Sequence, residues 1–171
     1  MPKLTNNIDK LLAVARQEIE AFTIPSEERI LVYYSLFPAL GGAPFKMIVT
    51  ENTHKDICSR LRQWEASYHR GIWNLGIYRL DNLRLITEAQ ILSTSNTKVL
   101  LKELNRLQTL PLPDTLPKEN GIVLDGAQGT LGIHYQQLQV DYVWEVSNPA
   151  AQFLHPLIAQ LIAFHALLDG Y

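Results

Sequence analysis

Cysteine is nearly absent from the chain: Cys58 is the only one, so no disulfide can form within it. An excess of basic residues is absent too, because 15 lysines and arginines are balanced by 17 acids and the formal net charge is −2. The basic residues are dispersed, which gives no electrostatic reason to expect nucleic acid as a partner. A lone thiol suits a reducing compartment, and we therefore expect a cytoplasmic protein.

Long apolar runs are also missing. No stretch of about 18 apolar residues occurs, so no transmembrane helix is expected. The first 22 residues have acids inside their apolar stretch and no small-residue cleavage site, which does not match a secretory signal peptide. The sequence accordingly predicts no membrane association.

The spacing motifs of enzymes and cofactor-binding proteins do not occur. The sequence has no Gly-x-x-x-x-Gly-Lys phosphate loop and no set of Cys, His and acidic residues at zinc-site spacing. Asp125-Gly126 is not followed by the regular acids of a calcium loop, and its position between apolar runs is typical of a hairpin turn. We therefore expect no catalytic, cofactor-binding or metal-binding residue, and we favour a protein that is not an enzyme.

What the sequence does contain is the composition of a folded domain. Of its 171 residues, 47% are apolar and 19% are charged, which predicts one globular domain over residues 1–171. Residues 108–120 hold three prolines and no period, so they are predicted to form a surface connector. They are not a domain boundary, because the two strands and one helix that follow are too short to form a second core.

Periodicity predicts the first elements. From Ile8 to Phe22 apolar residues recur at helical spacing, and Pro25 ends this helix. Residues 29–37 and 45–50 are rich in β-branched and aromatic residues and are predicted to be strands. A second helix is predicted after Thr53, which can cap it, and Gly71 would end it. Its apolar stripe would comprise Ile57, Leu61, Trp64 and Tyr68.

The middle of the chain allows two interpretations. Residues 71–80 and 83–92 read as a hairpin around Asp81-Asn82, both of which tolerate the positive φ of a tight turn. The alternative for 83–92 is a helix, because some of its apolar residues also fit that period. A further helix is predicted after Asn96. Its apolar face would comprise Val99, Leu100, Leu104 and Leu107.

Strict alternation predicts two long strands in the second half. Residues 130–135 and 138–146 alternate between apolar and polar side chains, with a turn at Gln136-Gln137 between them. The elements together predict an α+β fold in which antiparallel hairpins form a sheet and helices pack on it.

The terminal helix is predicted to be buried. Asn148 can cap it, and Pro156 is expected to break or kink it near His155. Beyond Pro156 the helix is apolar nearly all round, which places it centrally in the core or in an interface.

Several residues that could carry chemistry have plainer interpretations. His155 and His165 are ten residues apart, whereas helical metal pairs are usually three or four apart, so we expect a packed or half-exposed pair. Cys58 lies on or near an apolar stripe and is interpreted as a buried, inert thiol. The tryptophans are flanked by apolar periodic residues and are predicted to lie in the core. They are Trp64, Trp73 and Trp144.

Acidic residues gather near the end of the first helix, at Glu18, Glu20, Glu27 and Glu28. Paired carboxylates can do acid–base work, but these are predicted to form a solvated surface. Glu88 lies on a mixed polar and apolar face of the 83–92 strand, and we expect it on the surface of an edge strand.

Three motifs in about the last 80 residues stand out: LDG at 124–126, YVW at 142–144 and HPLIAQLI at 155–162. In this respect the second half resembles a broad group of uncharacterised small bacterial proteins, some of which are thought to be immunity partners of bacterial toxins. The resemblance implies a hairpin, a strand with a core aromatic residue and a terminal helix. It carries no catalytic residue.

The leading functional interpretation is therefore a non-enzymatic bacterial binding protein with a protein partner. Its most concrete form is an immunity protein that neutralises a toxin by direct binding. One alternative is a small enzyme or ligand-binding domain with a pocket near the Gly41-Gly42 loop, since such loops often line sites. Another is a structural subunit of a larger assembly that uses the terminal helix as its interface.

Overall fold

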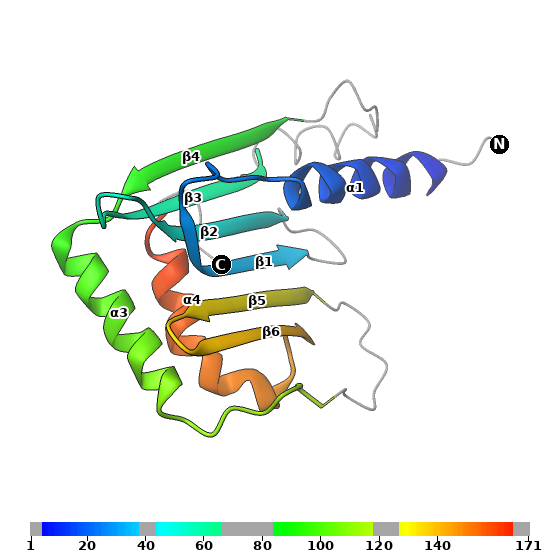
Figure 1. The fold of residues 1–171 in the computed structure, drawn as a ribbon. Helices are drawn as coiled ribbons and strands as arrows, with labels where there is room; N and C mark the ends of the chain where they lie inside the picture. The colour runs from blue at the N-terminus through cyan, green and yellow to red at the C-terminus, as the bar shows by residue number, and fades with distance from the viewer. Residues whose placement is uncertain (1–4, 38–43, 66–83, 118–126, 166–171) are drawn as a thin grey trace.

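The computed structural model describes residues 5–37, 44–65, 84–117 and 127–165. In chain order the elements (Figure 1) are α1 (Thr5–Glu20), β1 (Arg29–Phe37), β2 (Phe45–Glu51), β3 (Ile57–Trp64), β4 (Leu85–Ile91), α3 (Thr94–Gln108), β5 (Gln128–Tyr135), β6 (Leu138–Glu145), the 3-10 helix η2 (Pro149–Leu154) and α4 (His155–Ile162). Within these ranges, no helix is long and apolar enough to cross a membrane.

The strands form one six-stranded sheet in the order β4-β3-β2-β1-β5-β6, and every neighbouring pair is antiparallel. β1 is central because it pairs with β2 on one side and with β5 on the other. This position explains why its sequence, RILVYYSLF, is apolar on both faces. The predicted α+β fold, with helices packed on an antiparallel sheet, is confirmed.

One face of the sheet, the covered face, packs against α3, η2 and α4. Side chains alternate along a strand, so β2 sends Phe45, Met47 and Val49 to this face, and all three are fully buried. From the helices come Leu100, Leu104 and Leu107 of α3 and Leu157 and Leu161 of α4, each at most 1% exposed. The predicted burial of the terminal helix is therefore confirmed.

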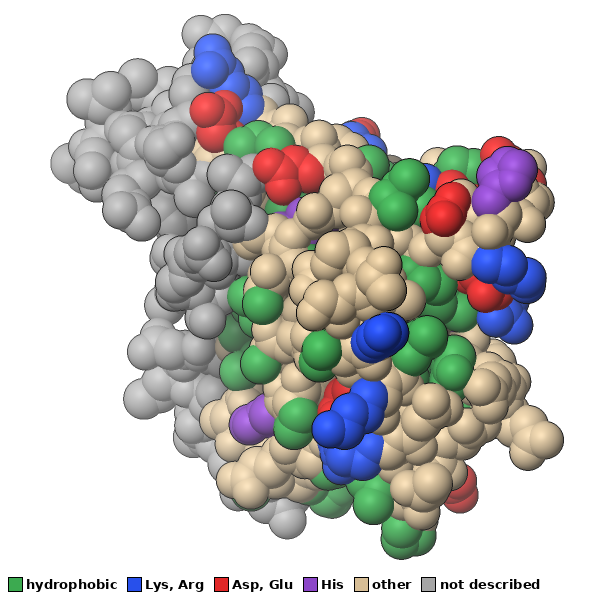
Figure 2. All heavy atoms as spheres, turned by 90° about the vertical axis from the view of Figure 1, so that its left-hand side faces the viewer, with side chains coloured by type: hydrophobic (Ala, Val, Ile, Leu, Met, Phe, Trp, Pro, Cys, Tyr) green, Lys and Arg blue, Asp and Glu red, His purple; other side chains and the backbone are tan. Residues whose placement is uncertain are grey.

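The outer surface beside α3 is mixed in character. Figure 2 shows this side of the molecule, where small groups of hydrophobic side chains lie between charged and polar ones. Val99 is 44% exposed, so its predicted place on the buried stripe of this helix is wrong. The helix also begins earlier than predicted, because Ser93 rather than Asn96 caps it and accepts a hydrogen bond from the Asn96 backbone.

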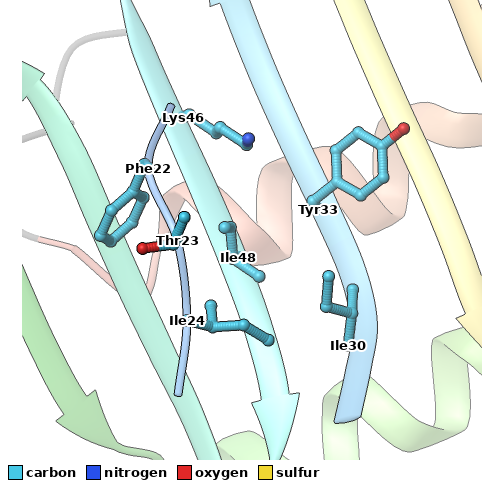
Figure 3. Close-up of a pocket in the computed structure, with 7 residues that line it drawn as sticks. All are labelled: Phe22, Thr23, Ile24, Ile30, Tyr33, Lys46 and Ile48. Carbon is cyan, nitrogen blue, oxygen red and sulfur yellow. The ribbon is translucent and has the colours of Figure 1, made fainter. Parts of the chain in front are cut away.

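The opposite face, the strap face, is built differently. α1 lies at the ends of β2 and β3 (Figure 1), where Ala15 and Ile19 pack with Trp64. The chain then runs over the sheet as residues 21–28, here called the strap, before it enters β1 (Figure 1). In Figure 3 part of the strap lies in front of the strands, and α4 lies behind them.

The helix predicted after Thr53 is wrong, because residues 57–64 form β3. The Asn52 side chain accepts hydrogen bonds from the backbones of His54 and Asp56, and Lys55 takes a φ of 69°. These bonds build a tight turn between β2 and β3 instead of a helix start.

The helical spacing in β3 arises because both faces of the sheet are covered at this point. Ile57 and Leu61 lie on the covered face, whereas Trp64 lies on the other face against α1. Ile57 and Leu61 are four positions apart on one face, and Trp64 follows three positions later on the other face, so the spacing imitates a helical stripe.

Most of the remaining predictions can be compared with the structure. Residues 85–91 form strand β4, which pairs with β3, so the strand interpretation of 83–92 is confirmed. β5 and β6 form the predicted hairpin, and Gln136 at its turn has a φ of 52°. The proposed turns at Asp81-Asn82 and Asp125-Gly126 lie outside the described residues.

The break in the terminal helix is confirmed. Asn148 caps η2 by accepting a hydrogen bond from the Ala150 backbone, as predicted, but the first segment is a 3-10 helix. α4 starts at His155, directly before Pro156. Pro156 lacks the backbone N–H that a continuous helix would use, so the chain changes helix type at this point.

Candidate functional site

A buried ion pair fixes the strap next to β1. Arg60 on β3 donates hydrogen bonds to both carboxylate oxygens of Glu28, at 2.5 and 2.6 Å, and the Thr50 hydroxyl donates to the same carboxylate. The Glu28 side chain is only 8% exposed. Burial alone would raise the pKa of Glu28, but the hydrogen bonds from Thr50 and Arg60 and the charge of Arg60 outweigh burial and lower it. Glu28 is therefore held as a carboxylate and ties the strap to β2 and β3.

Two cations fix the other end of the strap, where α1 finishes. Lys46 Nζ on β2 donates to the backbone carbonyl of Glu20 at 2.9 Å, and Arg62 on β3 reaches the carboxylate of Glu18 at 3.3 Å. The Glu20 carboxylate itself pairs with Arg16 at 2.8 Å. Positive charge near the C-terminus of a helix is favourable, so these contacts hold the end of α1 on the sheet.

Between the two anchors lies a pocket of about 380 Å³. Figure 3 shows it between the strap and the neighbouring parts of β1 and β2. The described residues that line this strap pocket are Phe22, Thr23, Ile24, Ile30, Tyr33, Lys46 and Ile48. The volume is in the range of ligand pockets, roughly 300–1,000 Å³.

Tyr33 forms the side of the pocket that faces β5. Its hydroxyl donates to Asp141 at 2.6 Å, and its ring packs edge-on against His134. The ring can lie across β5 because Gly132 has no side chain: a Cβ there would stand 2.1 Å from Tyr33 Cε1. Burial, with a further contribution from Asp141, raises the pKa of Tyr33, so the hydroxyl keeps its proton. The Tyr33 side chain is therefore held in place and is itself uncharged.

The lining of the strap pocket suits binding better than bond making. Four of its described side chains are hydrocarbon: Phe22, Ile24, Ile30 and Ile48. The Tyr33 hydroxyl is already committed to Asp141, and Lys46 is the one basic or acidic side chain among the described lining residues. The described lining residues include no carboxylate, imidazole or thiol, so they offer apolar contact and a single positive charge.

A second polar cluster has the connectivity of a hydrolase triad. Ser59 Oγ lies 2.8 Å from His165 Nε2, and His165 Nδ1 lies 3.2 Å from a carboxylate oxygen of Glu88. Ser59 is 0% exposed, however, and it does not line the hollow of about 440 Å³ beside Glu88 and His165. An acyl group cannot reach a hydroxyl in that position, so the cluster ties the end of α4 to β3 and β4.

The histidines do not behave as a pair. His155 is exposed at the start of α4, whereas His165 is 1% exposed and contacts Ser59 and Glu88. Burial lowers the pKa of His165, and the hydrogen bond with Glu88 and its charge oppose this only in part. Glu88 lies on β4, which is an edge strand of the sheet, as predicted. The contact between Glu88 and His165 was not predicted.

The other candidate residues take structural positions. Cys58 is buried and its pKa is raised, mainly by burial, which fits the predicted inert thiol. Trp64 and Trp144 lie in the core, as predicted, at 1% and 5% exposure. Trp73 and the Gly41-Gly42 loop lie outside the described residues.

The predicted solvated cluster of acids is correct for three of its members. Glu18, Glu20 and Glu27 are exposed. The prediction is wrong for Glu28, because its carboxylate is buried against the sheet, where it contacts Arg60 and Thr50. Within the described ranges, no three His, Cys, Asp or Glu side chains gather as a metal site would require.

Comparisons of the chain with protein family models, with curated proteins and with solved structures found no match.

Proposed function

We propose that the chain is a non-enzymatic binding protein and that the strap pocket receives a group of a protein partner. The observation that carries this proposal is the pocket itself, an apolar hollow on a sheet, fixed between two polar anchors. Protein interfaces draw much of their affinity from a few residues seated in pockets of this kind. A pocket held in place before binding also lowers the ordering cost of association.

The most concrete partner is a bacterial toxin that the chain neutralises in the cytoplasm by direct binding. This form of the proposal comes from the resemblance of the second half to immunity proteins. Tyr142 and Trp144 of the YVW motif are core residues, and HPLIAQLI forms α4, so these motifs support a shared arrangement of strand and helix. We assign contact with the partner to the strap face instead.

A capture experiment tests the assignment. The wild-type chain, Ile30→Trp and Val99→Trp are immobilised at equal density and exposed to a lysate of the source organism. Ile30→Trp fills the pocket, whereas Val99→Trp adds the same side chain on α3, away from the strap face, at a site that is 44% exposed. We expect wild type and Val99→Trp to retain the same protein, and Ile30→Trp to retain at least about tenfold less of it.

An unfolding curve first establishes that Ile30→Trp is folded, and Ile24→Trp on the strap replaces it if it is not. Equal retention by the filled and open pockets would contradict the proposal. The proposal is also contradicted if no protein is retained by both wild type and the Val99→Trp control.

A further inference from the structure

We infer that the group which enters the strap pocket is an apolar residue with a carboxylate beside it, and that Lys46 receives this carboxylate. The inference rests on the proposed function and names the chemistry of the partner's group. It is drawn from the distribution of charge around the pocket.

Lys46 differs from the arginines of the two anchors because its hydrogen-bond partner is a backbone carbonyl and not a carboxylate. The arginines each meet a carboxylate, in the pairs Arg60–Glu28 at 2.5 Å, Arg16–Glu20 at 2.8 Å and Arg62–Glu18 at 3.3 Å. Among the described residues Lys46 forms no ion pair, and its contact is the backbone carbonyl of Glu20. An ammonium group has three donors, so further donors remain for a ligand.

The surroundings of Lys46 favour an anion. Arg62 stands directly opposite Lys46 in the pairing of β2 and β3, and like charges in such positions repel each other. The Lys46 side chain is partly buried, and this burial lowers the pKa of Lys46, which the charge of Glu20 opposes only in part. A carboxylate in the pocket would replace lost solvation and offset the repulsion from Arg62.

The remaining walls fix the orientation of the bound group. Ile24, Ile30 and Ile48 gather on one side in Figure 3, and they offer contact to a hydrocarbon part. At the Tyr33 wall the nearest charge is Asp141, which accepts a hydrogen bond from the Tyr33 hydroxyl and would repel the carboxylate of the bound group. The carboxylate therefore lies at Lys46, and the apolar part lies against the isoleucines.

Octanoate and octanol are suitable probes because they share a hydrocarbon chain and differ in charge. Their affinities for the full chain are measured by calorimetry at low salt, for wild type, Lys46→Gln and Lys98→Gln. Lys98 lies exposed on α3, so its variant removes the same charge from another part of the surface. We expect wild type and Lys98→Gln to bind octanoate about tenfold more tightly than octanol, and Lys46→Gln to lose this preference.

The outcomes separate the inference from the proposed function. Equal affinity for both probes in wild type, or a preference that survives in Lys46→Gln, overturns the role of Lys46 and leaves an apolar pocket that can still bind a protein. Absence of binding by either probe overturns the inference as well. In the capture experiment octanoate should release the protein that depends on the pocket more effectively than octanol. Binding of octanoate without such release would mean that a small carboxylate, and not a partner protein, occupies the pocket.

Discussion

The two faces of the sheet are held by different forces. On the covered face, leucines of α3 and α4 and aromatic residues of the sheet are buried together in one large apolar cluster. On the strap face the apolar cluster is small, centred on Ala15, Ile19 and Trp64, and the strap is attached by the Glu28–Arg60 pair and by the end of α1. Apolar burial thus closes one face, whereas a few charged contacts hold a short segment across the other.

This difference separates stability from binding. A close-packed apolar layer has no room for a ligand, and any change in its side chains alters stability. The strap is fixed at two points, and a pocket lies between them. Substitution of the residues that line this pocket should therefore change the stability of the apolar core little.

Removal of apolar volume from the covered face should have the largest effect. Leu161→Ala creates a cavity at a site that is 1% exposed, and it should lower the free energy of unfolding by about 2–5 kcal/mol. The matched control Leu110→Ala, at 36% exposure, should cost well under half of that. Denaturant unfolding measures both. The loss should not depend on protein concentration, and a concentration-dependent loss would instead place α4 in a dimer interface.

Loss of the buried ion pair should release the strap. Arg60→Met leaves the Glu28 carboxylate in its buried site without its cation, and we expect a cost of about 2–3 kcal/mol. Arg29→Met breaks the more exposed pair with Glu51 and should cost less than about 1 kcal/mol. If both variants lose the same stability in denaturant unfolding, the pair does not anchor the strap. The double variant Glu28→Gln with Arg60→Met should recover part of the loss, because no buried charge remains.

The wall of the pocket depends on a missing side chain. Gly132→Ala would place a Cβ 2.1 Å from Tyr33 Cε1, so the ring must move, at a cost of about 1–3 kcal/mol. The same change in a Tyr33→Ala background should be less costly, since the ring is gone and only the exposed Asp141 carboxylate still has to move away from the Cβ. Unfolding free energies of the four proteins in this cycle give the coupling, and purely additive costs would mean that the ring does not rest on Gly132.

The smallest effect concerns pH and belongs to the covered face. Burial lowers the pKa of His165 in the folded chain, so the unfolded chain binds the proton first as the pH falls. The stabilising contribution is full above the unfolded value, about 6.5, and is lost as the pH falls through the lowered folded value. Unfolding free energies at pH 7.5 and 5.5 should differ more in wild type than in His165→Gln. Equal differences would show that His165 does not titrate with unfolding.

Sequence patterns correctly predicted the strands and helices whose apolar residues follow a single periodicity. β5 and β6 alternate strictly because each is a half-covered strand beside a tight turn, and the terminal helix is recognised by its apolar run after Asn148. β3 was not predicted to be a strand, because Trp64 packs in the small apolar cluster on the strap face, whereas Leu61 packs in the large cluster on the covered face. Trp64 is covered by α1, which lies far from it in the sequence, so a short stretch of sequence around β3 cannot reveal this contact.

The candidate site was harder to predict than the fold. The face of β3 that carries Arg60 and Arg62 also carries Cys58 and Trp64, so no strict alternation of polarity marked this segment as a strand. Nothing in the sequence joins these arginines to acids more than thirty residues away, so Glu28 was placed on a solvated surface. Tyr33 and Lys46 entered the site because the strap crosses two strands, which depends on tertiary structure alone.

The position of the bound partner on the molecule decides whether the strap face is the binding face. Hydrogen–deuterium exchange of the chain, free and with the captured protein bound, reports which amides the partner protects. Exchange should slow in the strap and in the adjacent residues of β1 and β2, and it should be unchanged in α3 and on the exposed side of α4. Protection confined to α3 and α4, with an unchanged strap, would contradict the assignment of binding to the strap face.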